Sequence, residues 1–338
     1  MYKDELINLF NSIDEKKFRA TQLFKFIHQE KQNNINDITV FSKSLREKLL
    51  EFTTIRNINI EEVIKSKLDK TRKYIFRLYD NHYIEAVYME SKANNTICIS
   101  TQVGCKMSCA FCASTKNGYK RNLSASEMLS QVYEVENHMG NRIDNIVLMG
   151  IGEPFDNYDN VIRFIKLIND SEGHNTGIRN ITLSTCGIVD GIRKLADSEL
   201  QVNLAISLHN AIQKEREAIM PIAKANSLTD LKKALIYYQE KLNRRISYEY
   251  VIIKDNNDSF DHARALKSMC VDLDAHVNLI PLNKIDEYHA KSTDDRDIER
   301  FKEKLDDLGI NSTIRRKQGV DIEAACGQLR NKYEQFTR

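Results

Sequence analysis

Six short apolar segments alternate with longer amphipathic segments through the chain, and this alternation limits the possible folds more than any other feature. Strands that alternate with helical segments form parallel sheets, because each helix carries the chain back across the sheet. A capping-box pattern from Ser124 to Glu127 marks the start of one helix, which we expect to run to about Met139. The six predicted strands cover residues 96–100, 145–149, 180–184, 202–207, 247–253 and 276–280.

The part of the chain before these strands has two other patterns. Residues 1–54 carry apolar side chains at helical spacing, which predicts a small helical module. Two alternating segments, 73–79 and 83–88, flank Asp80 and Asn81, which predicts a β-hairpin between two domains. We therefore expect three parts: a helical domain over 1–60, a hairpin linker over 61–92 and an α/β core over 93–330.

The composition restricts the class and the compartment. A chain of 338 residues with 41% apolar and 29% charged residues can bury a large core. It has neither an apolar run of about 18 residues nor a signal peptide, so we expect a cytoplasmic protein with no membrane partner. Seven cysteines, three of them close together, favour a metal site in a reducing compartment over a framework of structural disulfides.

Directly after the first predicted strand, Cys105, Cys109 and Cys112 form a Cys-x3-Cys-x2-Cys arrangement. Three thiolates can hold three irons of a 4Fe-4S cluster and leave the fourth iron open to a small molecule. The alternatives are a zinc site, which requires a fourth ligand, or buried thiols, which a lysine-flanked loop, expected to be exposed, disfavours. The loop resembles that of radical S-adenosylmethionine enzymes, in which the cofactor occupies the open iron and yields a 5′-deoxyadenosyl radical.

The loops after the later strands carry small or polar residues suited to such a cofactor. Gly152 lets the backbone approach a ligand, and Glu153 offers a carboxylate to an ammonium group. Phe111, between two of the cysteines, is suited to covering the adenine. Because the carboxyl ends of parallel strands meet at one edge, we expect further cofactor contacts from Ser184, Ser207, Leu208, His209 and Asn283.

Near the end of the chain, residues 319–329 read Gly-Val-Asp-Ile-Glu-Ala-Ala-Cys-Gly-Gln-Leu. This segment resembles the signature of the adenine-methylating radical enzymes called RlmN, whose sister group is Cfr. The resemblance covers nearly the whole chain and includes Phe18 to Gln22, Thr101 to Cys105 and the turn from Gly150 to Pro154. It implies a partial (β/α)6 TIM-like barrel with a helical RNA-binding domain.

The resemblance also implies a mechanism. Carbon 2 of adenine is electron-poor, so a nucleophilic carbon radical can add where an electrophilic methyl group cannot. Two S-adenosylmethionine molecules are used per turnover: one methylates Cys326, and the other generates the radical that activates the S-methyl group. Cys98 then resolves the adduct and leaves a disulfide, while Glu85 acts as proton acceptor, although a hairpin carboxylate is usually solvated. Cys186 and Cys270 are expected to be structural.

The resemblance implies RNA substrates and an electron donor. The expected substrates are 23S ribosomal RNA in the peptidyl-transferase region and the anticodon loop of some transfer RNAs, with flavodoxin or ferredoxin as donor and a monomeric enzyme. Pro154 favours carbon 2, whereas Cfr-type enzymes methylate carbon 8 and have alanine there. Because the net charge is only +2, any RNA surface is local, and candidate clusters are Lys116, Lys120 and Arg121; Arg244 and Arg245; and Arg315, Arg316 and Lys317.

Two functions of other classes compete with this interpretation. A non-catalytic iron–sulfur electron carrier would generally use a fourth cysteine and has no need of the glycine turn. A glycyl-radical activase shares the cluster but has no use for Cys98 and Cys326. Binding of S-adenosylmethionine distinguishes the methylating enzyme from the electron carrier, and a methyl group on Cys326 distinguishes it from the activase.

Overall fold

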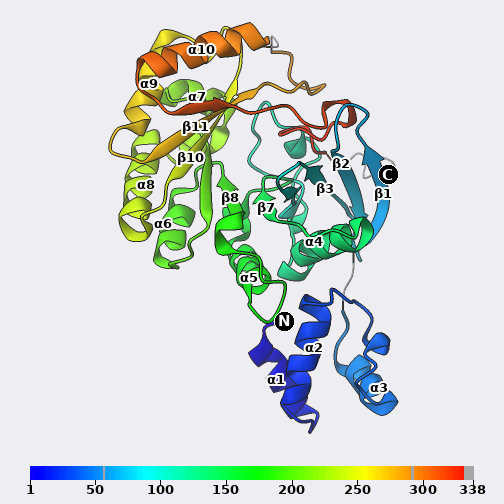
Figure 1. Ribbon diagram of the computed structural model, residues 1–338. Coiled ribbons are helices and arrows are strands. Elements are labelled where there is room, and N and C mark those ends of the chain that lie inside the picture. The colour runs from blue at the N-terminus through cyan, green and yellow to red at the C-terminus, as the bar shows by residue number, and fades with distance from the viewer. Residues whose placement is uncertain (56–57, 291–292, 331–338) are drawn as a thin grey trace.

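The computed structural model describes residues 1–55, 58–290 and 293–330, and its main feature is a ten-stranded sheet (Figure 1). The seven strands from β4 to β12 in the sheet order are parallel to their neighbours, which confirms the predicted α/β sheet. In sheet order the strands are β1 (Asn59–Lys65), β2 (Arg72–Arg77), β3 (Tyr83–Glu90), β4 (Asn95–Cys98), β7 (Asn145–Leu148), β8 (Ile181–Thr185), β9 (Asn203–Ser207), β10 (Ile246–Ile252), β11 (Ala275–Pro281) and β12 (Ser312–Ile314).

All six predicted core strands are present, and each end lies within two residues of its predicted position. Leu204, Ala205 and Ile206 are all buried although they are consecutive, because helices cover the sheet on one face and the barrel interior lies on the other. The sequence analysis missed β1 and β12, as well as a small separate pair, β5 (Gln102–Val103) and β6 (Arg121–Asn122).

The core helices follow the parallel strands and form the outer layer in Figure 1. The capping box is confirmed: Glu127 N donates to the Ser124 hydroxyl at 3.3 Å, and Ser124 N donates to the Glu127 carboxylate at 2.9 Å. Within the described ranges, no helix combines the length and the apolar character needed to cross a bilayer. The core helices are α4 (Ala125–Met139), α5 (Tyr158–Asn169), α6 (Val189–Asp197), α7 (Gln213–Ile219), α8 (Leu228–Leu242), α9 (Phe260–Cys270) and α10 (Asp295–Asp307).

The predicted helical module consists of α1 (Lys3–Ser12), α2 (Phe18–His28) and α3 (Lys43–Phe52), and it lies beside α4 and α5 (Figure 1). His28 Nδ1 lies 3.1 Å from the Tyr133 hydroxyl, and Asn33 donates to Glu134 at 3.1 Å. Buried side chains of the module belong to the same apolar cluster as those of the core. The module is therefore packed directly on the core.

The predicted hairpin is formed by β2 and β3, which pair antiparallel from Arg72 opposite Tyr88 to Arg77 opposite Tyr83. It does more than link two domains, because β3 also pairs with β4, where Val87 lies opposite Cys98. The hairpin therefore extends the core sheet. The proposed division at residues 60 and 92 stays a prediction, and β1 begins at Asn59, just before the first of these positions.

Arg121 links the hairpin to α4. Its guanidinium donates to Asp80 at 2.6 Å and to both carboxylate oxygens of Glu127, at 2.8 and 3.0 Å. Two acidic partners therefore compensate its charge. The basic cluster expected beside the cysteine loop is thus reduced to Lys116 and Lys120.

We predict that Arg121→Met lowers the free energy of unfolding by about 2 kcal/mol, because the buried Glu127 carboxylate loses its cation. Urea unfolding followed by circular dichroism measures this change. Lys120→Met removes an exposed charge next to it and should leave the midpoint unchanged. Equal midpoints for the two variants would contradict a structural role for Arg121.

Candidate active site

Two adjoining cavities open at the carboxyl ends of the parallel strands. The first has a volume of about 860 Å³ and lies between the cysteine loop and the ends of β7 to β10. The second, of about 690 Å³, lies between β3, β4 and the segment that follows β12. Cys326 and Arg315 line both cavities, so they stand where the two meet.

The three cysteines of the loop all line the first cavity. Cys105 and Cys109 are buried rather than exposed, which corrects the expectation from the flanking lysines. Burial raises the pKa of the Cys105 thiol to about 12 and also raises the pKa values of Cys109 and Cys112. The loop is fixed by Ala110 N, which donates to the Ile219 carbonyl at 2.9 Å.

This donor set fits a 4Fe-4S cluster. In such a cluster each cysteine binds a different iron, so the sulfurs do not need to converge on one point. Among the residues that the structure describes, no group of three or more His, Cys, Asp or Glu side chains lies close enough to hold a single metal ion. The described residues therefore contain no ready zinc site. Iron would replace the thiol protons, which burial otherwise retains.

The turn after β7 requires its glycines. Gly152 has a φ of +115°, and a Cβ atom there would lie 2.7 Å from the Thr101 hydroxyl oxygen. A Cβ atom on Gly150 would lie 2.6 Å from the Ile99 carbonyl oxygen. The close approach brings Glu153 into the wall of the first cavity, next to the cysteines.

The buried Glu153 carboxylate accepts hydrogen bonds from Cys186 N at 2.7 Å and Phe155 N at 3.0 Å. Burial raises its pKa, and among the described residues no cation pairs with it. A buried carboxylate without a cation suits a ligand that carries an ammonium group. The amino group of S-adenosylmethionine meets this requirement.

Ser184, Ser207 and His209 also line the first cavity, where the sequence analysis expected them. Burial, together with the charge of Arg216, lowers the pKa of His209 to about 3. Its Nδ1 accepts from Val251 N at 3.1 Å, so the neutral ring carries its proton on Nε2. Phe111 packs edge-on against this ring, with centroids 4.7 Å apart.

Two expected cofactor contacts lie elsewhere. Leu208 lines neither cavity: its side chain is buried in the core and its carbonyl accepts from Arg216 at 3.0 Å. Asn283 lines the second cavity and donates to the Cys326 carbonyl at 3.1 Å. Its contact is thus with the loop that carries Cys326.

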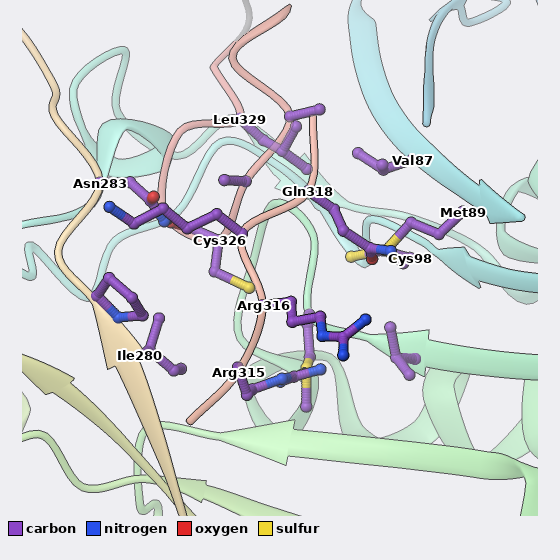
Figure 2. A pocket seen from close by; sticks show the side chains of 16 residues that line it. Val87, Met89, Cys98, Ile280, Asn283, Arg315, Arg316, Gln318, Cys326 and Leu329 are labelled. Carbon is purple, nitrogen blue, oxygen red and sulfur yellow. Dashed lines mark hydrogen bonds between the residues drawn. The ribbon is translucent and has the colours of Figure 1, made fainter. Parts of the chain in front are cut away.

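The second cavity brings together Cys98 from β4 and Cys326 from the segment after β12 (Figure 2). Burial raises the pKa of Cys98 to about 12. Cys326 is exposed to the cavity, yet nearby protein atoms desolvate its thiol and raise its pKa. The positive charge of Arg315 opposes both shifts, and Arg315 is held by an ion pair of 3.1 Å with buried Glu249.

Glu85 is buried in β3 rather than solvated, which corrects the usual expectation for a hairpin carboxylate. Its carboxylate accepts from Arg330 N at 3.1 Å. Alternate residues of a strand share a face, so Glu85 lies on the same face as Val87 and Met89, which line the second cavity.

The sequence analysis missed Cys186, which lines the first cavity beside Glu153. Its position directly after β8 was the available signal, because chemistry gathers at the ends of parallel strands. Cys270 ends α9 and lines neither cavity, so it remains a structural thiol.

Comparisons with known proteins agree with this geometry. The family model described as the radical SAM superfamily matches residues 99–266, and the model of the ribosomal RNA large subunit methyltransferase N-terminal domain matches residues 1–55. A radical SAM domain uses a 4Fe-4S cluster and S-adenosylmethionine, so the expected cofactors are confirmed.

Two relatives are each named probable dual-specificity RNA methyltransferase RlmN. The one from Finegoldia magna is 48% identical over 98% of this chain and 95% of its own length. The one from Clostridioides difficile is 46% identical over 98% of this chain and 96% of its own. The crystal structure of a radical SAM methyltransferase from Sphaerobacter thermophilus is 36% identical, with a TM-score of 0.94 over 98% of both chains, and confirms the barrel fold.

Cys112→Ala should abolish the cluster, whereas Cys186→Ala should retain it, because three thiols suffice for a cluster with one open iron. Iron and acid-labile sulfide per chain, measured on anaerobically purified protein, check this expectation. Cys186 is the matched control, since its thiol lines the same cavity. A cluster lost equally in both variants would identify four protein ligands and contradict the open iron.

Proposed function

Because this chain belongs to the RlmN family of radical S-adenosylmethionine RNA methyltransferases, we propose that it methylates carbon 2 of an adenine. The proposed substrates are 23S ribosomal RNA in the peptidyl-transferase region and the anticodon loop of some transfer RNAs. A flavodoxin or ferredoxin is the proposed electron donor, and the enzyme acts as a monomer. Pro154, in the turn that carries Glu153, supports carbon 2 over carbon 8.

One observation carries the proposal: Cys326 lines both cavities, and Cys98 lines only the second. When bound, the cluster and S-adenosylmethionine supply a methyl group and a radical that can abstract hydrogen. An electron carrier or an activase has no use for two thiols in addition to the three of the cysteine loop. A methyl carrier, in contrast, has to meet the cofactor on one side and the RNA base on the other, and Cys326 has such a position.

In this function Cys326 holds the methyl carbon on its sulfur, and the adenine enters the second cavity. After the new carbon–carbon bond has formed, the adduct loses the ring proton and one electron, which the cluster would accept when bound. The Cys98 thiolate then attacks the sulfur of Cys326. The bond between sulfur and carbon breaks, its electron pair passes to the carbon, which takes up a proton to become the methyl group, and a disulfide joins the two cysteines. Arg315 supports this step, because its positive charge favours the thiolate form of Cys98. Glu85 is the proposed acceptor of the proton lost from the ring.

The mouth of the second cavity suits RNA. Arg316 and Lys317 line it, both are exposed, and neither forms an ion pair with the described residues. Free cations at this position can bind the phosphates that flank an adenine turned out of its stack. The helical module packs on α4 and is the proposed second contact with RNA.

RNA from cells with the gene should contain 2-methyladenosine that RNA from cells without the gene lacks. Nucleoside digestion followed by chromatography and mass spectrometry measures this difference, and cells that carry Cys326→Ser serve as the control. If 8-methyladenosine is found instead, the regiochemistry is wrong. If neither nucleoside depends on the gene, the proposed function is wrong.

Cys98→Ala should accumulate protein that is covalently joined to RNA through Cys326, because no thiol is present to break the bond between sulfur and carbon. Denaturing gel electrophoresis with labelled RNA detects the adduct. Cys270→Ala is the control and should release methylated RNA, since Cys270 lines neither cavity. Recovery of only free RNA from Cys98→Ala would contradict its resolving role.

A further inference from the structure

The segment that carries Cys326 has little regular structure to fix its position. Strand β12 ends at Ile314, and one short 3-10 turn, Val320–Ile322, follows it within the described residues. Cys326 nevertheless has to face two cavities from one place. A displacement of about 1 Å is enough to reduce catalysis strongly, so contacts outside the segment have to hold it.

The turn between β1 and β2 supplies two such contacts through Asp321. The Ser66 hydroxyl donates to Asp321 Oδ1 at 2.7 Å, and Lys67 N donates to Asp321 Oδ2 at 2.8 Å. These two hydrogen bonds hold the pKa of Asp321 below its usual value. They join residues about 250 positions apart in the chain.

Asp69 of the same turn supplies a third contact, because its Oδ2 accepts from Gly319 N at 2.9 Å. The approach is close: Gly319 has a φ of +62°, and a Cβ atom there would lie 2.8 Å from Thr71 Cγ2. Asp69 is itself oriented by Thr71 N, which donates to it at 2.8 Å. Three hydrogen bonds therefore fix the start of the segment to the β1–β2 turn.

The far end of the segment is held separately. Ala113 N, next to the cysteine loop, donates to the Gly327 carbonyl at 2.7 Å, and the Ser114 hydroxyl donates to the Leu329 carbonyl at 2.7 Å. Cys326 thus lies between two anchors. One anchor is the cysteine loop, and the other is the β1–β2 turn.

We propose that Asp321 and Asp69 are positioning residues, which hold residues 319–327 against the β1–β2 turn so that the Cys326 sulfur faces both cavities. The inference rests on the proposed role of Cys326 as methyl carrier. The β1–β2 turn thus has a part in catalysis, because it holds the segment that carries Cys326. The carboxylates contact neither substrate nor cofactor cavity, since neither of them lines one.

Two measurements on Asp321→Ala test the proposal. Hydrogen–deuterium exchange of peptides that cover 315–326 requires no activity, and it should become roughly tenfold faster, as expected when hydrogen bonds to a charged acceptor are lost. The second measurement is the ratio of methylated RNA to 5′-deoxyadenosine formed. We expect this ratio to fall about tenfold, because a displaced sulfur uncouples radical formation from transfer.

Controls separate positioning from general damage. Glu90→Gln removes a β3 carboxylate that pairs with Lys70 instead of with the segment that carries Cys326, and it should change neither measurement. Asp321→Asn keeps one acceptor and should lie between wild type and Asp321→Ala.

Each outcome is decisive. Unchanged exchange and an unchanged ratio in Asp321→Ala would overturn the proposal. A parallel loss of product and 5′-deoxyadenosine, with the ratio kept, would also overturn it, because that result means a smaller folded fraction. Wild-type protein without a methyl group on Cys326 would instead contradict the proposed function, and the exchange measurement would still decide whether Asp321 holds the loop.

Discussion

The proposed function imposes one constraint on the site: a single sulfur has to face two cavities. Cys326 meets it because the parallel sheet gathers its loops at one edge and the segment after β12 passes over that edge. Neither cavity belongs to one element. The first is made by the cysteine loop and the ends of four strands, and the second by the hairpin, β4 and the last segment. The fold therefore positions the chemistry by bringing together loops that are distant in sequence.

Burial at this edge controls the reactivity of the thiols. Cys98 and the cluster cysteines are shielded from water, so burial raises their pKa values and keeps the free thiols protonated. Nearby positive charge is required to form a thiolate there. Arg315 provides this charge between the two cavities. Glu249 holds the guanidinium in place, and its negative charge partly offsets that of Arg315. The pair joins the partly exposed Arg315 to the buried Glu249 and so orients the guanidinium.

The parts of the structure that follow from local pattern were predictable from the sequence. Strand positions and the capping box at Ser124 depend on neighbouring residues, and the structure confirms them. The surroundings of single side chains were not predictable, because they depend on tertiary packing. Glu85 lies on a hairpin yet is buried, since β3 pairs on both sides. Leu208 follows a strand end like its neighbours, but its side chain points into the core.

The hairpin shows why this limit is physical. As an isolated motif it satisfies the turn chemistry at Asp80 and Asn81, and nothing local indicates a further partner. In the structure it extends the core sheet through β4, and the turn between β1 and β2, just before it, contacts the segment that carries Cys326. Because β1 and β12 stand at the two ends of the sheet, strand pairing among the described residues does not close the barrel, and β3 and the last segment line the second cavity. A substrate as large as RNA requires such an open side. In our proposal, the contacts between the β1–β2 turn and the last segment also determine where the Cys326 sulfur lies.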